Sequence, residues 1–101
     1  MSRTVCNITI VCYDFTNNKV RRKVEKTLCD YGVRVQYSLF ACRLDSDQLV
    51  QLRAKLTELL EVFRDKLEST DSVVVLDRLP YEKIDTVFGH KWPGKEKCEI
   101  Y

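Results

Sequence analysis

The sequence contains few of the residues on which several common kinds of functional site depend. It has three glycines and two prolines in 101 residues, and the glycines form no G-x-G-x-x-G or P-loop pattern, which argues against a nucleotide-binding loop. Its five cysteines form no C-x-x-C pair and it has one histidine, so neither a common zinc site nor a cysteine–histidine nucleophile is indicated. The chain shows no apolar run long enough for a signal peptide or a membrane span. We therefore expect a cytoplasmic protein with no membrane partner.

The composition instead indicates a folded domain whose first half is basic. Hydrophobic residues make up 45% of the chain and charged residues 32%, as in globular proteins. The net charge is only +2, but residues 1–45 contain eight Lys or Arg and four Asp or Glu, whereas residues 46–80 contain five and seven. A surface that binds polyanions is therefore expected in the first half.

The first half predicts a strand, a basic helix and a second β-rich stretch. Residues 5–13 are mostly β-branched or aromatic, and their apolar residues alternate with Asn7 and Thr9, the pattern of a half-buried strand. A helix is predicted to begin near Thr16 or Asn17 and to end at Gly32 in the left-handed conformation. Its apolar stripe consists of Val20, Val24, Leu28 and Tyr31. Residues 33–44 are long enough for two short strands.

The second half predicts a long helix, a buried strand and a short tail. Asp45 or Ser46 can cap the helix, with Gln48 completing a capping box. The stripe facing the core consists of Leu49, Leu52, Leu56, Leu59, Leu60, Phe63 and Leu67. Residues 73–79 are almost wholly apolar and end at Pro80, so we predict a buried strand there. Alternation over residues 84–88 predicts a weak extra strand, and the rest resembles a tail.

This order of elements predicts the α+β class and, within it, a ferredoxin-like βαββαβ sandwich. Residues 1–80 would form the ferredoxin-like domain, and residues 81–101 a C-terminal strand and docking tail. Both helices would cover one face of the sheet. The other face would stay open, which predicts a homodimer.

Three stretches of the chain together resemble the CRISPR-associated Cas2 family. They are the strand that ends in Tyr13-Asp14, the basic helix around VRRKV at 20–24, and the stretch YGVRVQYSLF at 31–40. The resemblance implies a homodimer that bridges two dimers of the Cas1 integrase and holds duplex DNA while new spacers are inserted. It also implies an endonuclease activity on RNA or DNA that many members show with magnesium.

The resemblance assigns roles to single residues. Asp14 matches the family's metal-site aspartate, which makes it the candidate catalytic and metal-binding residue. The matching motif positions around it are Tyr13, Arg21, Arg34, Ser38 and Phe40. The sequence departs from the family where acidic residues are frequent, at Asn17, Asn18 and Ala41.

Elementary chemistry leaves two roles open for Asp14. Magnesium prefers hard oxygen ligands, and two Asp14 carboxylates could share one Mg²⁺ across a homodimer, with Arg21 or Arg34 holding the phosphate. Alternatively, Asp14 begins the turn and helps to cap the first helix. The alternation along the first strand predicts that Asp14 points toward the helices.

The cations of the first helix are the candidate nucleic-acid contacts. Together with Arg34 they are Lys19, Arg21, Arg22, Lys23 and Lys26. They could follow phosphates without reading sequence, or form an ordinary solvated helix face. Tyr37 and Phe40 could stack on bases, or belong to the core or to a dimer interface.

Three functions therefore compete. The leading hypothesis is a DNA-bridging adaptor in spacer acquisition, with magnesium-dependent cleavage left open. The second is a stand-alone metal-dependent ribonuclease of the virulence-associated toxin type. The third is a dimer with a purely structural or small-ligand role, which predicts no salt-dependent binding to duplex DNA.

Overall fold

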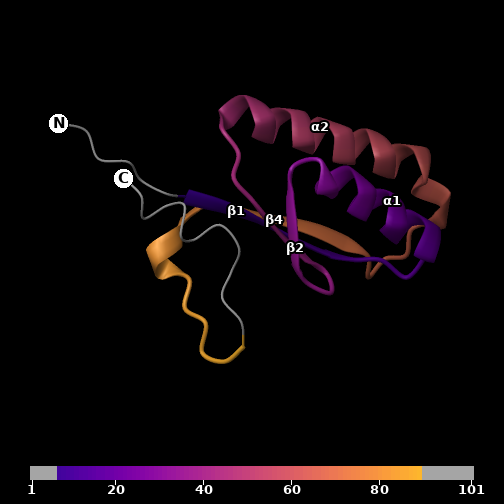
Figure 1. Cartoon of the computed structure of the whole chain (residues 1–101). Coiled ribbons are helices and arrows are strands. Elements are labelled where there is room, and N and C mark those ends of the chain that lie inside the picture. Colours follow the sequence, from indigo (N-terminus) through magenta and orange to yellow (C-terminus); the bar gives the residue numbers. More distant parts are fainter. Residues whose placement is uncertain (1–6, 90–101) are drawn as a thin grey trace.

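The fold is built on an antiparallel sheet in the order β2-β3-β1-β4, with both helices on one face (Figure 1). The structure is a computed structural model that describes residues 7–89. Its elements are β1 (Asn7–Asp14), α1 (Asn18–Cys29), β2 (Gly32–Gln36), β3 (Leu39–Cys42), α2 (Ser46–Val62) and β4 (Ser72–Pro80), with 3₁₀ turns at Arg64–Lys66 and Tyr81–Lys83. The predicted βαββαβ order is thereby confirmed. Among the residues described, there is no helix with the length and apolar character needed to cross a membrane.

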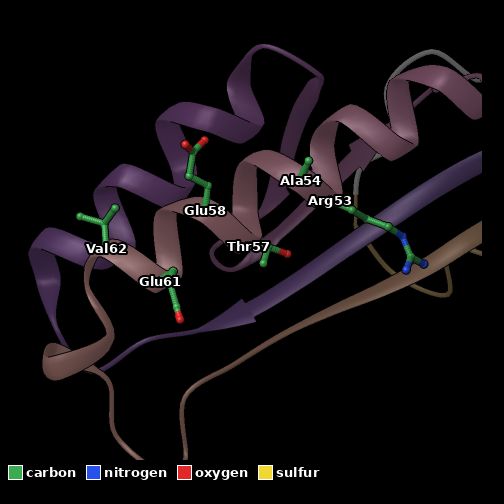
Figure 2. A pocket seen from close by; sticks show the side chains of 6 residues that line it. All are labelled: Arg53, Ala54, Thr57, Glu58, Glu61 and Val62. Atoms are coloured by element: carbon green, nitrogen blue, oxygen red, sulfur yellow. The ribbon is translucent and has the colours of Figure 1, made fainter.

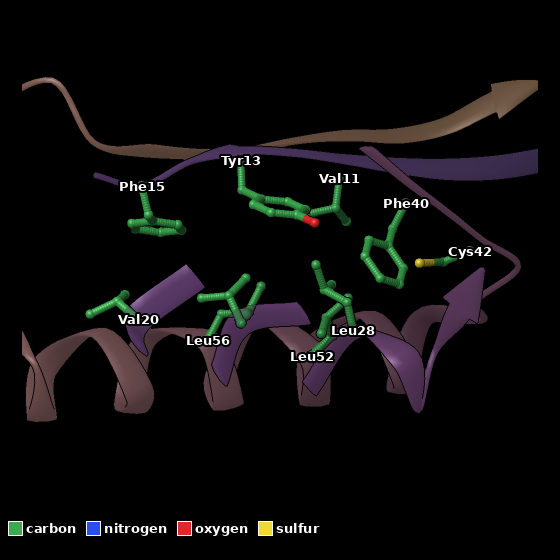
Figure 3. Packing of buried hydrophobic residues seen from close by; sticks show 10 residues of the cluster. Val11, Tyr13, Phe15, Val20, Leu28, Phe40, Cys42, Leu52 and Leu56 are labelled. Atoms are coloured by element: carbon green, nitrogen blue, oxygen red, sulfur yellow. The ribbon is translucent and has the colours of Figure 1, made fainter. Parts of the chain in front are cut away.

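The core between sheet and helices is formed by the predicted stripes. Val20, Val24 and Leu28 of α1 and Leu52 of α2 are fully buried in one cluster with strand residues. Figure 3 shows Val20, Leu28 and Leu52 facing these strand residues across the layer. The predicted caps are also present. Asn17 accepts bonds from the backbone N–H groups of Lys19 and Val20, and Asp45 and Gln48 form the capping box of α2.

Strand β1 is buried on both faces, so the prediction of a half-buried strand was wrong. Val11 and Tyr13 pack with the helices, whereas Ile8 and Ile10 pack on the opposite face. Even Thr9, expected on a solvent face, is 2% exposed. Its hydroxyl donates to the Asp77 carboxylate at 3.3 Å, which satisfies this buried polar group.

Gly32 is needed for close packing of β2 on β3 and not for a left-handed helix end. Helix α1 ends at Cys29, and Gly32 begins β2. A Cβ atom at Gly32 would lie 2.6 Å from Cys42 Sγ and closer still to the Ala41 carbonyl oxygen. The predicted role of Gly32 was therefore wrong, and its lack of a side chain is what the strand pair requires.

A β-bulge near the end of β4 redirects the chain onto the open face of the sheet. Ile10 pairs with Leu76 but Ile8 pairs with Leu79, which leaves one extra residue in β4, and Arg78 has φ of 55°. Such a bulge shifts the alternation by one residue. Leu79 therefore packs against the cluster that contains Ile8 and Ile10.

The open face is partly covered by the chain that follows the bulge. Tyr81 is 3% exposed and packs with Ile8, Ile10 and Ala41, and Ile84 lies against the same cluster. The rest of this face is apolar and bare, because Val74 and Leu76, which the sequence placed in a buried strand, are 48% and 43% exposed. The prediction of a buried strand over residues 73–79 was wrong, because β4 is an edge strand.

The extra strand predicted over residues 84–88 is not formed. Residues 81–83 make a 3₁₀ turn, and no strand follows it up to residue 89. Val87 and Phe88 are almost completely exposed. Most of the predicted tail lies outside the described residues, and the domain boundary at residue 80 stays a prediction.

Candidate metal and nucleic-acid sites

Asp14 is the last residue of β1, and its side chain is exposed. Because Tyr13 packs toward the helices, alternation along the strand places Asp14 on the open face. The prediction that Asp14 points toward the helices was wrong, since residues of the other parity fill that side. Asn17 is the N-cap of α1, so Asp14 does not serve as the cap.

One chain supplies one carboxylate to the candidate metal site. Within residues 7–89, no three His, Cys, Asp or Glu side chains are grouped so that they could hold a metal ion. Magnesium is commonly bound by one or two carboxylates together with water and substrate phosphate. An exposed Asp14 on an apolar, unpaired face fits half of such a site, and a second copy would have to supply the other half.

Asp71 fixes the turn that follows Asp14, and sequence reasoning missed it. Its carboxylate accepts bonds from the backbone N–H of Glu68 at 2.8 Å and from the N–H and hydroxyl of Thr16 at 3.0 and 3.1 Å. The next residue, Ser72, pairs with Asp14 across β4 and β1. These bonds, that of Glu68 foremost, hold the pKa of Asp71 below its usual range.

Tyr13 is a buried anchor for the turn between β2 and β3. Its hydroxyl donates its one hydrogen to Glu25 Oε2 at 2.8 Å and also lies 3.3 Å from the Tyr37 carbonyl oxygen. Burial, then the bond to Glu25, raises the pKa of Tyr13 far above its usual value. The residue is therefore neutral and holds structure. Ser38 and Phe40 also have structural roles. The Ser38 carbonyl accepts a bond from the Tyr13 N–H, and Phe40 is 1% exposed in the core.

Two arginines meet at the same turn. Arg34 forms an ion pair with Glu25 at 2.8 Å and donates from Nε and Nη2 to the Tyr37 carbonyl at 3.2 and 3.1 Å. The guanidinium carbons of Arg21 and Arg34 lie 5.8 and 5.6 Å from the Tyr37 ring centroid, within cation–π range. Arg21 and Arg34, either of which was expected to hold a phosphate beside Asp14, therefore lie together on the side of the sheet that carries α1, not on the face of Asp14.

The remaining cations of α1 form an exposed row. Arg22, Lys23 and Lys26 are exposed and form no ion pair within the described part of the chain. Lys19 Nζ lies 5.8 Å from the ring of Phe63. The predicted site residues therefore lie on opposite sides of the sheet. Asp14 is on the open face, and the cations are on the helix side.

The structure also has a shallow depression along α2, which contains neither Asp14 nor the cations of α1. It is lined by Arg53, Ala54, Thr57, Glu58, Glu61 and Val62 (Figure 2). None of these is a predicted site residue, and Glu61 is already paired with Arg64. An open groove of mixed charge offers no chemistry comparable with the two sites above.

Comparison with known proteins identifies the family. The profile of "CRISPR associated protein Cas2" matches residues 7–81. The chain belongs to the Cas2 family. It is similar to "CRISPR-associated endoribonuclease Cas2 1" of Rhodospirillum rubrum, with 37% identity over 76 residues that cover 75% of this chain and 69% of the relative.

Further relatives agree in sequence and in structure. "CRISPR-associated endonuclease Cas2" of Halalkalibacterium halodurans is 38% identical over 65 residues, which cover 59% of this chain and 68% of that protein. The crystal structure of Streptococcus pyogenes Cas2 superposes with a TM-score of 0.62 and 27% identity, covering 80% of this chain and 99% of that one. The resemblance seen in the sequence is therefore confirmed.

The Asp71 bonds predict a specific dependence of stability on pH. A lowered carboxyl pKa stabilises the fold above the ordinary value of 3.8, and this contribution is lost as the pH falls below that value. We expect Asp71→Asn to lower the melting temperature near neutral pH, and the difference from wild type to vanish in acid. Thermal denaturation followed by circular dichroism between about pH 7 and pH 3 measures this.

Glu68→Gln is the matched control, because it removes a neighbouring carboxylate and leaves the backbone N–H in place. It should show no comparable pH-dependent difference. An Asp71→Asn variant whose deficit persists unchanged at low pH would contradict the assignment.

Proposed function

We propose that a homodimer of this chain holds the backbone of duplex DNA and bridges Cas1 integrase dimers during spacer integration. The observation that carries the DNA-binding part is the exposed row of Arg22, Lys23 and Lys26 on α1, which is free of ion pairs within residues 7–89. Cations that are not neutralised by the protein bind phosphates and release counterions. Contacts of this kind need no base readout, as suits a protein that handles duplexes of many sequences.

The homodimer is supported by the bare part of the sheet. Val33, Val74 and Leu76 are about half exposed, and their strand partners place them on the face opposite the helices. An apolar sheet face of this kind is commonly covered by a second copy. Pairing through it would bring two Asp14 residues to one interface and leave both α1 helices on the outside.

Magnesium-dependent cleavage of RNA or DNA at the paired Asp14 residues is the second part of the proposal. Magnesium held there would supply charge neutralisation and an activated water for attack on phosphorus. The two carboxylates would hold the ion, and the Asp71 bonds would keep the turn after each Asp14 in place. Support comes from the exposure of Asp14 and from the relatives whose names describe an endoribonuclease and an endonuclease.

The stand-alone metal-dependent ribonuclease of the toxin type remains the alternative function. It needs the same Asp14 pair but no duplex binding and no Cas1.

The Cas1 part of the proposal rests on family membership, and a truncation after Ile84 tests it. The cut falls there because Tyr81 and Ile84 pack against the sheet, and removing them would disturb the fold. The truncated chain should still bind duplex DNA but should no longer co-purify with Cas1. Full retention of the Cas1 complex would count against docking through the tail.

The α1 row should control the salt dependence of duplex binding. We expect a triple substitution of Arg22, Lys23 and Lys26 to Gln to weaken binding, and to lower the slope of log affinity against log salt by about 0.9 for each phosphate that the variant no longer neutralises. Fluorescence anisotropy with a labelled duplex across salt concentrations measures both quantities.

The control changes three cations on other elements, Arg53, Lys66 and Lys83, to Gln. The slope of this variant should stay at the wild-type value. Equal losses of affinity in the two variants would contradict duplex binding through the α1 cations. Binding by wild type that does not change with salt concentration would contradict it as well.

Asp14 should be required for cleavage but not for binding. Because changes even outside a metal's ligand set cost about 10- to 100-fold, we expect Asp14→Asn to reduce magnesium-dependent cleavage of RNA or DNA by at least roughly 100-fold. Duplex affinity should be unchanged. Gel assays with and without Mg²⁺ measure the first quantity, and anisotropy measures the second.

Asp47→Asn serves as the control, because Asp47 is an exposed carboxylate in the first turn of α2. Its cleavage should equal that of wild type. Undiminished cleavage by Asp14→Asn would remove the enzymatic part of the proposal and leave the DNA-binding part standing.

A further inference from the structure

The turn between β2 and β3 presents an aromatic ring to solvent. Tyr37 is 69% exposed, although aromatic side chains usually bury most of their surface. The guanidinium groups of Arg21, from α1, and Arg34, from β2, lie within 6 Å of its ring centroid. Of the roles left open for Tyr37, a place in the core is therefore excluded, and base stacking or a dimer interface remains.

One of the two arginines at this ring, Arg34, is held in place before any ligand arrives. Arg34 donates from Nε and Nη2 to the Tyr37 carbonyl, and from Nη2 also to Glu25. Glu25 is itself fixed by the hydroxyl of the buried Tyr13. Nη1 of Arg34 donates no bond within residues 7–89, and Arg21 forms no ion pair there. With two cations and one carboxylate, the cluster keeps a net positive charge and unused donors.

We propose that Arg21, Arg34 and Tyr37 bind one unpaired nucleotide of a single strand. The base stacks on the Tyr37 ring, and the neighbouring phosphate accepts bonds from the unused arginine donors. Aromatic rings and guanidinium planes are the surfaces on which unpaired bases stack, and guanidinium groups match phosphate oxygens. A base inside a duplex offers no free ring face to such a side chain.

The place of the cluster in the fold agrees with this role. Contact with Arg21 of α1 puts the Tyr37 ring on the helix side, so dimerisation through the open face would leave it accessible. The same helix carries Arg22, Lys23 and Lys26. The inference rests on the proposed nucleic-acid binding and adds to it a preference for single-stranded ends or segments, in DNA or in RNA.

The experiment compares Tyr37→Ala and Tyr37→Phe with wild type in the full chain. Affinities are measured for oligo-dT, for oligo-U and for a blunt duplex. From the usual contribution of one base–aromatic stack, Tyr37→Ala should weaken single-strand binding about 5- to 150-fold. Duplex binding should stay within about twofold, because phosphate contacts alone carry it. Tyr37→Phe keeps the ring and should bind single strands like wild type.

A fluorescent base gives a readout that a change in folding would not mimic. Stacking quenches 2-aminopurine, so wild type and Tyr37→Phe should alter its emission in a single strand, and Tyr37→Ala should not. The dT and U arms show whether DNA, RNA or both are accepted.

Unchanged single-strand affinity in Tyr37→Ala would overturn the stacking site, and so would equal losses of affinity for single strand and duplex. Salt-dependent duplex binding would still support the proposed function in either case. If wild type binds no polynucleotide at low salt, the proposed function fails, and this inference fails with it.

Discussion

The structure depends on the burial of β1 on both of its faces. Its odd-numbered side chains, Val11 and Tyr13, pack against the helices, and its even-numbered ones, Ile8 and Ile10, pack beneath the chain around Tyr81. A slip of β1 by one residue would turn each apolar set to the opposite face, where it would meet the wrong packing partners, and would point Asp14 toward the helices. The same alternation therefore fixes the core, directs Tyr13 toward Glu25 and leaves Asp14 on the opposite face.

This arrangement separates two kinds of chemistry within a small domain. The helix side carries cations and an exposed aromatic ring, which suit the binding of phosphates and bases. The open face carries an apolar surface and a single carboxylate, which suit pairing with a second copy. Binding of nucleic acid and cleavage would then use different surfaces. A change at Asp14 would therefore weaken cleavage without weakening the binding of nucleic acid.

The sequence predicted those features that depend on neighbouring residues. The order of elements, the Asn17 cap, the Asp45 and Gln48 capping box and the apolar stripes all follow from local pattern. Features that depend on distant segments could not be predicted in this way. Ile8 and Ile10 are covered by Tyr81 and Ile84, about seventy positions later in the chain. The bulge that precedes these residues is not predicted by the apolar run of β4.

The candidate site shows the same division. The resemblance named Asp14, Arg21 and Arg34 as motif positions, but the side of the sheet on which Asp14 lies depended on the double burial of β1. The bonds that join Asp71 to Thr16 and Glu25 to Arg34 have no local sequence signal, because their partners are nine or more residues apart. Gly32 resembled a helix end in the sequence, yet its requirement arises from the neighbouring strand β3.

The distance between the two Asp14 carboxylates in a dimer tests the central claim most directly, and a crystal structure of the full chain grown with Mg²⁺ would give it. The account predicts that the open faces meet and that carboxylate oxygens of the two Asp14 residues lie within roughly 4 Å of each other around one ion, given Mg–O distances near 2.1 Å. A dimer joined through the helices, with the two Asp14 residues on remote surfaces, would contradict it.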